Sequence, residues 1–201
     1  MNLEADGVEY EMLESAVESV SQVPGLILEI GTRKGGSMEK IINSLMKSGQ
    51  AGRNVISVDP YGHIPYNSGK QYGITRFDYT NEMKKEAMAA LFELVKNKPV
   101  NFVPFCLTDQ VFMWLFSDGV PIYDNMERCI NLYAFAFLDG PHDTASVLSE
   151  IKFLSDRMVK GAAIIIDNID FFDLSYVITA AKMDGFEVVK KGEHKIWICK
   201  Q

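Results

Sequence analysis

Short continuous runs of apolar residues recur along the chain, separated by stretches with an apolar residue every three or four positions. The runs have the length of strands, and their continuous apolar character is expected of parallel strands buried on both faces. The longer stretches have the period of amphipathic helices. Strand candidates are residues 25–31, 54–59, 100–107, 133–139, 161–167, 186–190 and 195–199, and helical patterns cover 8–20, 37–46 and 81–98 and follow the strands ending at 139 and 167.

This alternation predicts an α/β fold, a doubly wound and mostly parallel seven-stranded sheet with helices on both faces. The last two strand candidates flank a short connection that contains Gly192, which predicts an antiparallel C-terminal hairpin. A chain of this length suits one core, so we expect a single domain over residues 1–201. Within it, residues 1–22 are expected to form an N-terminal covering helix.

Residues 60–80 interrupt the pattern with several glycines, prolines and tyrosines. We expect an inserted loop here, because long ordered loops are often functional. Its tyrosines either form a lid that stacks on substrate or pack the loop against the protein.

The composition bears on partners and location. The formal net charge is −7 and Lys and Arg form no stripe, so we expect no nucleic-acid partner. The longest apolar runs are far shorter than the roughly 20 residues that span a bilayer, so we expect no membrane segment. Three separated cysteines indicate neither a disulfide framework nor a zinc site, and the acidic N-terminus lacks the pattern of a signal peptide. We therefore expect a cytoplasmic protein.

Polar residues stand at the ends of five successive strand candidates. Such residues commonly end strands and cap helices, which is the plain structural alternative for any one of them. Because ligands of doubly wound sheets bind at the carboxyl ends of the strands, the set as a whole predicts a binding site. The residues are Glu29 and Gly31, Asp59, Thr108 and Asp109, Asp139, and Asp167 with Asn168.

The turn after the first strand, residues 29–37, is rich in glycine and indicates a nucleotide-like ligand, because glycine lets backbone approach a ligand closely. A dinucleotide-binding turn would have the spacing G-x-G-x-x-G. Arg33 stands at the middle glycine position, which makes a nicotinamide cofactor the weaker alternative.

The spacing of Glu29, Gly31 and Gly35, followed by Asp59 at the end of the second strand, resembles the class I methyltransferases. The resemblance implies S-adenosylmethionine as cofactor. Gly31 and its neighbours Thr32, Gly35 and Ser37 would then lie against the methionine part, and Asp59 would accept hydrogen bonds from the ribose hydroxyls. Thr108 and Asp109 would lie near the adenine, and Asp139 would also border the cofactor.

A narrower resemblance concerns the segments 137–143 and 164–168, which look like those of metal-dependent catechol-type and sugar-modifying O-methyltransferases. It implies a divalent ion held by Asp139, Asp167 and Asn168. Three oxygen donors of this kind suit Mg²⁺ or Ca²⁺. A hydroxyl bound to such an ion loses its proton more readily and attacks the sulfonium methyl.

His142 stands where the catechol enzymes place a lysine base, whereas some sugar-modifying relatives use histidine. We therefore expect catalysis by His142 and Asp139 on a hydroxyl of a small polyhydroxylated, sugar-like or catechol-like acceptor. A cap or a cofactor contact is the other interpretation of His142. The remaining alternatives are a metal-free O- or N-methyltransferase of the same fold and a non-catalytic cofactor-binding accessory protein. Related enzymes are often dimers, so a homodimer is possible by analogy.

Overall fold

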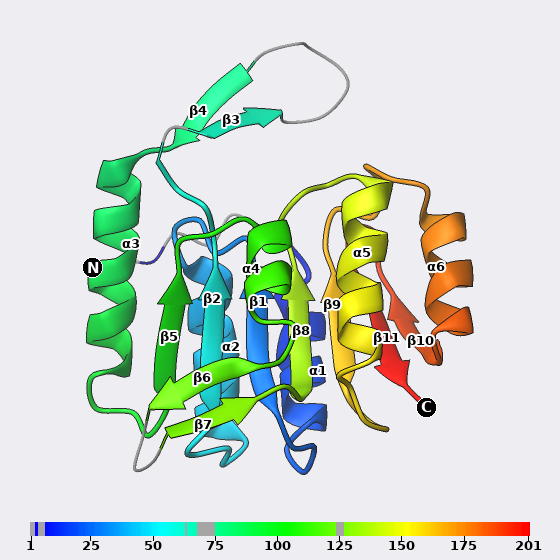
Figure 1. Ribbon diagram of the computed structural model, residues 1–201, viewed down its shortest axis with the longest axis horizontal. Helices are drawn as coiled ribbons and strands as arrows, with labels where there is room; N and C mark the ends of the chain where they lie inside the picture. The colour runs from blue at the N-terminus through cyan, green and yellow to red at the C-terminus, as the bar shows by residue number, and fades with distance from the viewer. Residues whose placement is uncertain (1–2, 4–6, 63, 68–74, 124–126) are drawn as a thin grey trace.

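The central sheet of the protein has the strand order β10-β11-β9-β8-β1-β2-β5, as the computed structural model shows (Figure 1). The structure describes residues 3, 7–62, 64–67, 75–123 and 127–201, with only the backbone of 64–67 and 75–79. The sheet strands are β1 (Leu26–Ile30), β2 (Asn54–Val58), β5 (Asn101–Phe105), β8 (Tyr133–Leu138), β9 (Ala163–Ile166), β10 (Phe186–Lys191) and β11 (Ile196–Lys200). The predicted doubly wound sheet is confirmed.

Pairing within the sheet also follows the prediction. Five neighbouring strands are parallel to one another, in the order β9, β8, β1, β2 and β5. Strand β11 pairs antiparallel with both β9 and β10. Ile27 of the central strand β1 stands opposite Val55 on one side and Phe135 on the other, so apolar residues meet across the middle of the sheet. The C-terminal hairpin therefore closes one side of a parallel core.

Helices cover both faces of the sheet, as the continuous burial of its central strands requires. In Figure 1, α4 and α5 lie in front of the sheet, and α1 and α2 lie behind it. Each layer has its own cluster of buried side chains, one with residues of α4, α5 and α6 and the other with residues of α1, α2 and α3. The helices are α1 (Tyr10–Ser19), α2 (Gly36–Lys47), α3 (Asn81–Val95), α4 (Asp109–Leu115), α5 (Thr144–Ser155) and α6 (Leu174–Met183).

The first helix is attached at its N-terminal end to the C-terminal hairpin. Glu9, which precedes α1, has a left-handed backbone with φ 57°. Its carboxylate accepts hydrogen bonds from the N–H groups of Glu193, His194 and Lys195 at 2.9 to 3.0 Å. The predicted covering helix thus spans Tyr10–Ser19, and its entry holds the tip of the hairpin in place.

The region 60–80, expected as a loop, contains two short strands. β3 (Ile64–Asn67) and β4 (Thr75–Tyr79) pair antiparallel, and Figure 1 places them beyond the carboxyl edge of the main sheet. The second segment alternates Thr75, Phe77 and Tyr79 with polar residues, which is the pattern of a strand, whereas Pro65 interrupts the alternation in the first. The frequent glycines and prolines hid this signal.

A second hairpin and one helix also differ from the sequence prediction. β6 (Val120–Tyr123) and β7 (Glu127–Ile130) pair antiparallel, and Val120 and Ile122 are buried in the core. Helix α4 follows β5, where no helix was predicted, because its seven residues are too few to show a clear period. Within the described residues, no helix is long and apolar enough to cross a bilayer.

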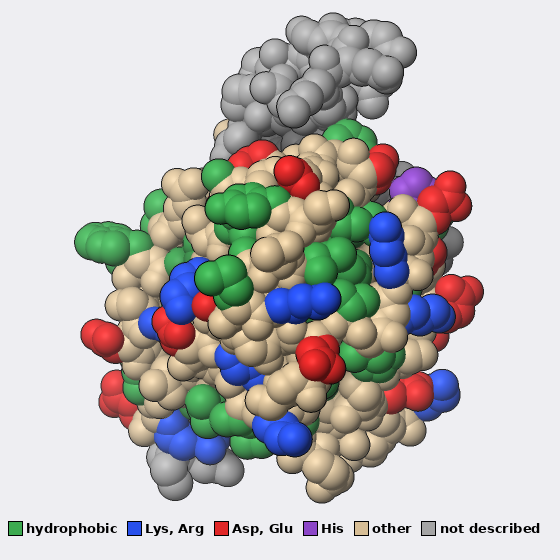
Figure 2. Space-filling view, turned by 90° about the vertical axis from the view of Figure 1, so that its right-hand side faces the viewer, with side chains coloured by type: hydrophobic (Ala, Val, Ile, Leu, Met, Phe, Trp, Pro, Cys, Tyr) green, Lys and Arg blue, Asp and Glu red, His purple; other side chains and the backbone are tan. Residues whose placement is uncertain are grey.

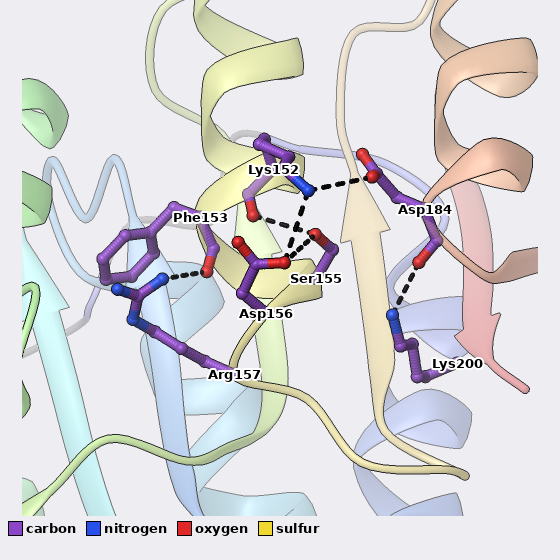
Figure 3. A network of polar contacts seen from close by, with 7 residues as sticks. All are labelled: Lys152, Phe153, Ser155, Asp156, Arg157, Asp184 and Lys200. Carbon is purple, nitrogen blue, oxygen red and sulfur yellow. Dashed lines mark hydrogen bonds and ion pairs between the residues drawn. The ribbon is translucent and has the colours of Figure 1, made fainter.

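Charged side chains at the amino edge of the sheet are paired and partly exposed (Figure 3). Lys152 contacts Asp156 at 3.3 Å and Asp184 at 3.2 Å, and Lys200 donates to the carbonyl oxygen of Asp184 at 2.6 Å. These contacts join the ends of α5, α6 and β11. The face seen in Figure 2 likewise carries basic and acidic side chains intermixed.

Candidate active site

Four acidic residues stand at or just beyond the carboxyl ends of four adjacent strands. Glu29 lies in β1, Asp59 follows β2, Asp139 follows β8, and Asp167 follows β9. Because β9, β8, β1 and β2 are neighbours in the sheet, these side chains form a row along one edge. The structure thus brings together the acids that the sequence placed at successive strand ends.

Asp59 fixes the turn that follows β1. Its Oδ2 atom accepts the N–H of Arg33 at 2.8 Å, and its Oδ1 atom accepts the N–H of Tyr61 at 3.2 Å. The Tyr61 hydroxyl in turn donates to the carbonyl oxygen of Arg33 at 2.6 Å, and Arg33 has φ 44°. A carboxylate has about four acceptor positions, so Asp59 keeps acceptor capacity beyond these two hydrogen bonds.

Gly31 in this turn is required by contact within the protein. Its φ is 90°, and a Cβ atom built on it would lie 2.0 Å from the carbonyl oxygen of Asp139. The ends of β1 and β8 therefore approach each other through the space that glycine leaves open. Gly31 was expected to leave this space to a ligand, whereas the backbone of Asp139 fills it.

Burial raises the pKa values of Glu29 and Asp59, the two acids next to this turn. Glu29 is fully buried, which raises its pKa to about 7, opposed by the Ser37 and Thr32 hydroxyls. Asp59 is raised to a pKa of about 6 by burial, opposed by the backbone N–H groups that it accepts. Within the described part of the chain, neither Glu29 oxygen makes a well-aligned hydrogen bond. A ligand with a charged amino group would supply donors to this carboxylate.

Asp139 and Asp167 meet a buried lysine. Lys195, in the turn of the C-terminal hairpin, places its Nζ atom 2.7 Å from Oδ1 of Asp167, and both side chains are buried. Burial and the charge of Asp167 raise the pKa of Asp139 well above its usual value, and the charge of Lys195 opposes the rise. Two carboxyl groups and one ammonium group thus share this part of the edge.

His142 lies beside Asn168. The His142 Nε2 and Asn168 Nδ2 atoms are 3.2 Å apart, and the backbone N–H of Asn168 donates to Asp167 Oδ1 at 2.8 Å. Burial lowers the pKa of His142, opposed by the charges of Asp167, Asp170 and Asp143. The imidazole is therefore neutral near pH 7, the form that accepts a proton.

The two residues assigned to the adenine lie against a different set of neighbours. The Thr108 side chain caps α4 by accepting the N–H of Val111 at 3.3 Å. Asp109 is buried, and its pKa is raised by burial and by the charge of Asp143. Asp109 lies near Glu150, a buried residue of α5, and the charge of Asp109 contributes to the raised pKa of Glu150.

Sequence reasoning missed Lys195 and Glu150. Glu150 interrupts the buried stripe formed by Val147, Ile151 and Leu154 on α5, and an acid within an apolar stripe is a readable signal. Lys195 has no such signal, because a lysine beside a glycine-containing turn is ordinarily exposed.

The metal assignment stays a prediction. Among the described residues, no three His, Cys, Asp or Glu side chains are grouped as a metal site. The predicted set contains two acids and Asn168.

The strand order, the turn after β1 and the acid after β2 define a class I methyltransferase that uses S-adenosylmethionine. The profile of the macrocin-O-methyltransferases, TylF, matches residues 9–186. The chain belongs to this family of O-methyltransferases. A comparison with curated proteins finds no match.

Solved structures of methyltransferases share the fold. The O-methyltransferase NovP is 19% identical with a TM-score of 0.60, over 96% of this chain and 79% of NovP. The calicheamicin methyltransferase CalS11, also described as a TDP-rhamnose 3′-O-methyltransferase, is 11% identical with a TM-score of 0.58, over 95% and 78%. PaMTH1 from Podospora anserina, solved with S-adenosylhomocysteine, is 10% identical with a TM-score of 0.55, over 98% and 80%.

Proposed function

We propose that the protein transfers a methyl group from S-adenosylmethionine to a hydroxyl of a small sugar-like acceptor, with His142 as the base. The observation that carries the proposal is the contact between His142 and Asn168, next to Asp139 and Asp167 and on the same sheet edge as the cofactor turn. The description of CalS11 as a TDP-rhamnose methyltransferase supports a nucleotide-linked sugar as the first acceptor to try.

The cofactor-binding part of the proposal uses the turn after β1 and its neighbours. Asp59 accepts hydrogen bonds from the ribose hydroxyls, and Glu29 faces the amino group of the methionine part. Gly31, Thr32, Gly35 and Ser37 shape the turn, and Thr108 and Asp109 border the adenine. The buried carboxylate of Glu29 fits this role, because burial disfavours its charged form and a cationic amino group would stabilise it.

In the chemical step, His142 removes the proton of the acceptor hydroxyl. The acceptor oxygen then forms a bond to the methyl carbon as the bond from that carbon to sulfur breaks, which leaves S-adenosylhomocysteine. The lowered pKa of His142 keeps its ring unprotonated for this step. The Asn168 amide group, 3.2 Å from His142 Nε2, orients the ring before the reaction, and Nε2 exchanges this hydrogen bond for the proton of the acceptor hydroxyl, because a neutral imidazole has one acceptor nitrogen. Asp139 lies beside the reacting groups and shapes the acceptor pocket.

Metal assistance is part of the same proposal. Asp139, Asp167 and Asn168 would hold a Mg²⁺ or Ca²⁺ ion, and their oxygen atoms are the donors that these ions prefer. The position already attracts a cation, because the Lys195 ammonium contacts Asp167 at 2.7 Å. When bound, the ion would lower the pKa of an acceptor hydroxyl. The same ammonium favours a second candidate, a metal-free transferase in which Lys195 alone balances the acids.

The hairpin β3–β4 is proposed to cover the acceptor. It lies beyond the carboxyl edge of the sheet, on the side where the acids stand (Figure 1). Its backbone pairing sets residues 64–67 and 75–79 side by side.

The testing experiment has two stages. Calorimetric titration with S-adenosylhomocysteine measures cofactor binding, and we expect micromolar affinity. Radiolabelled methyl transfer is then measured with a panel of nucleotide sugars and free sugars, with Mg²⁺, with Ca²⁺ and with chelator. Transfer to a sugar hydroxyl that chelator abolishes supports the full proposal, and transfer unaffected by chelator supports the metal-free candidate. Cofactor binding without transfer to any acceptor contradicts the proposed activity and favours an accessory protein.

A further inference from the structure

Lys195 is a fully buried lysine, which is rare unless the charge has a partner. Its position depends on the C-terminal hairpin, whose tip is held by three hydrogen bonds to the Glu9 carboxylate. This attachment fixes the backbone of Lys195, and its side chain extends to Asp167, Tyr10 and Phe137. The position of the ammonium group therefore depends on tertiary contacts, with Glu9 holding the hairpin turn and Asp167 contacting the side chain.

The surroundings of this ammonium form a cation site. Its Nζ atom lies 2.7 Å from Oδ1 of Asp167, 5.7 Å from the ring centre of Tyr10 and 5.5 Å from that of Phe137. Aromatic faces attract cations, and the carboxylate supplies the opposite charge. The charges of Asp139 and Glu29 also act on this group of side chains. The lysine thus provides one positive charge to an otherwise acidic cluster.

We propose that Lys195 is a built-in counter-ion that competes with a divalent metal ion for Asp167. This inference rests on the proposed metal-assisted function and concerns a residue outside the predicted ligand set. A divalent ion at Asp139, Asp167 and Asn168 needs the carboxylate that Lys195 now contacts. The ammonium must either move away from Asp167 or remain close to a second cation, and both lower the affinity for the metal.

The Oδ1 atom of Asp167 makes a second contact, with the segment that carries Asn168. The same Oδ1 atom that contacts Lys195 also accepts the N–H of Asn168 at 2.8 Å. This hydrogen bond orients the carboxylate toward the segment that carries Asn168. Lys195 therefore contacts the Asp167 carboxylate, which is both a predicted metal ligand and the hydrogen-bond partner of Asn168, the other predicted ligand after β9.

The test is a titration of the purified protein with Mn²⁺. Binding is measured by calorimetry and by the electron paramagnetic resonance signal of free Mn²⁺. The variant Lys195→Gln removes the charge and keeps a donor for Asp167, and Lys195→Met serves as a second variant. Lys47→Gln, at an exposed lysine paired with Glu18, is the matched control. We expect Lys195→Gln to bind Mn²⁺ at least about tenfold more tightly than the wild type, and Lys47→Gln to bind like the wild type.

Equal or weaker Mn²⁺ binding in Lys195→Gln and Lys195→Met would overturn the inference, as would the absence of binding in every variant. Binding of S-adenosylhomocysteine by each variant verifies that its fold is intact. Should the neutral variants not fold, the wild type still decides the matter through the ¹³Cε resonance of Lys195. That resonance must shift on addition of Mg²⁺, and an unchanged resonance contradicts the competition. The failure of the proposed function is separate, because it appears as absent cofactor binding or methyl transfer.

Discussion

The two edges of the sheet treat charge in opposite ways. At the amino edge, Arg53 donates to the carbonyl oxygens of Val20 and Val23 at 2.7 Å, and Lys152 pairs with Asp156 and Asp184 near solvent. At the carboxyl edge, Glu29 and Asp59 are buried with raised pKa values. The charged groups at the amino edge have nearby partners or solvent, whereas burial at the carboxyl edge raises the free energy of the ionised acids.

This difference separates stability from function. A buried acid with a raised pKa and few partners destabilises the fold, so its retention indicates a role in binding or chemistry. The contacts in Figure 3 are explained by joining helix ends, and the side chains of Lys152, Asp156 and Asp184 are partly exposed to solvent. Substitutions should therefore affect ligand binding and catalysis at one edge and modestly affect folding at the other.

The largest effect is expected for His142→Ala. Loss of the base should lower the rate of methyl transfer by about 100- to 10,000-fold, while the affinity for S-adenosylhomocysteine stays near that of the wild type. Steady-state kinetics and calorimetry check the two halves of this expectation. His194→Ala, which removes a partly exposed histidine near Asp170, is the control. Full activity of His142→Ala would assign the residue a structural role.

Asp59→Ala should weaken the binding of S-adenosylhomocysteine by about 1.5 to 3 kcal/mol, because the ribose hydroxyls lose a charged acceptor. Calorimetry measures the change, and Asp184→Ala at the amino edge should bind like the wild type. Unchanged affinity in Asp59→Ala would show that the ribose lies elsewhere.

The same residue predicts a pH dependence of binding. Its pKa is about 6, and the ionised carboxylate is the acceptor that the ribose needs. The affinity for S-adenosylhomocysteine should therefore fall as the pH drops below about 6. In Asp59→Asn the part of the decline centred near pH 6 should disappear, and its persistence would assign the titration to another group.

Glu150→Gln should stabilise the protein at pH 8. Burial raises the pKa of Glu150 well above 4.5, so the folded state keeps a proton that the unfolded state releases, and stability falls as the pH rises above about 4.5. The neutral amide removes this loss, and about 1 to 3 kcal/mol is the expected scale. Thermal unfolding at pH 5 and pH 8 tests the sign, since the variant should gain at pH 8 and little at pH 5.

The smallest effect is expected for Lys152→Ala. Its two contacts join exposed or partly exposed side chains, and such ion pairs contribute little. Its Tm should stay close to that of the wild type in low salt and coincide with it in high salt. A large drop would mean that the amino edge is held by these charges after all.

The sequence by itself determined the sheet, the order of its elements and the row of acids at the strand ends. These features follow from local rules, because buried parallel strands must be apolar and their carboxyl ends must begin the loops. The turn after β1 and the positions of Asp59, Asp139 and Asp167 were readable for the same reason. The helix α4 and the hairpins β3–β4 and β6–β7 were missed, since each is too short for its period to stand out.

Tertiary structure alone decided which charges meet. Lys195 reaches Asp167 because Glu9, far away in the sequence, holds the hairpin that carries the lysine. Gly31 is needed because the backbone of Asp139 lies against it, and Asp109 faces Glu150 and Asp143 through the packing of α4 on α5. Such contacts join distant segments, and their energies depend on burial and distance, which no local pattern of residues encodes.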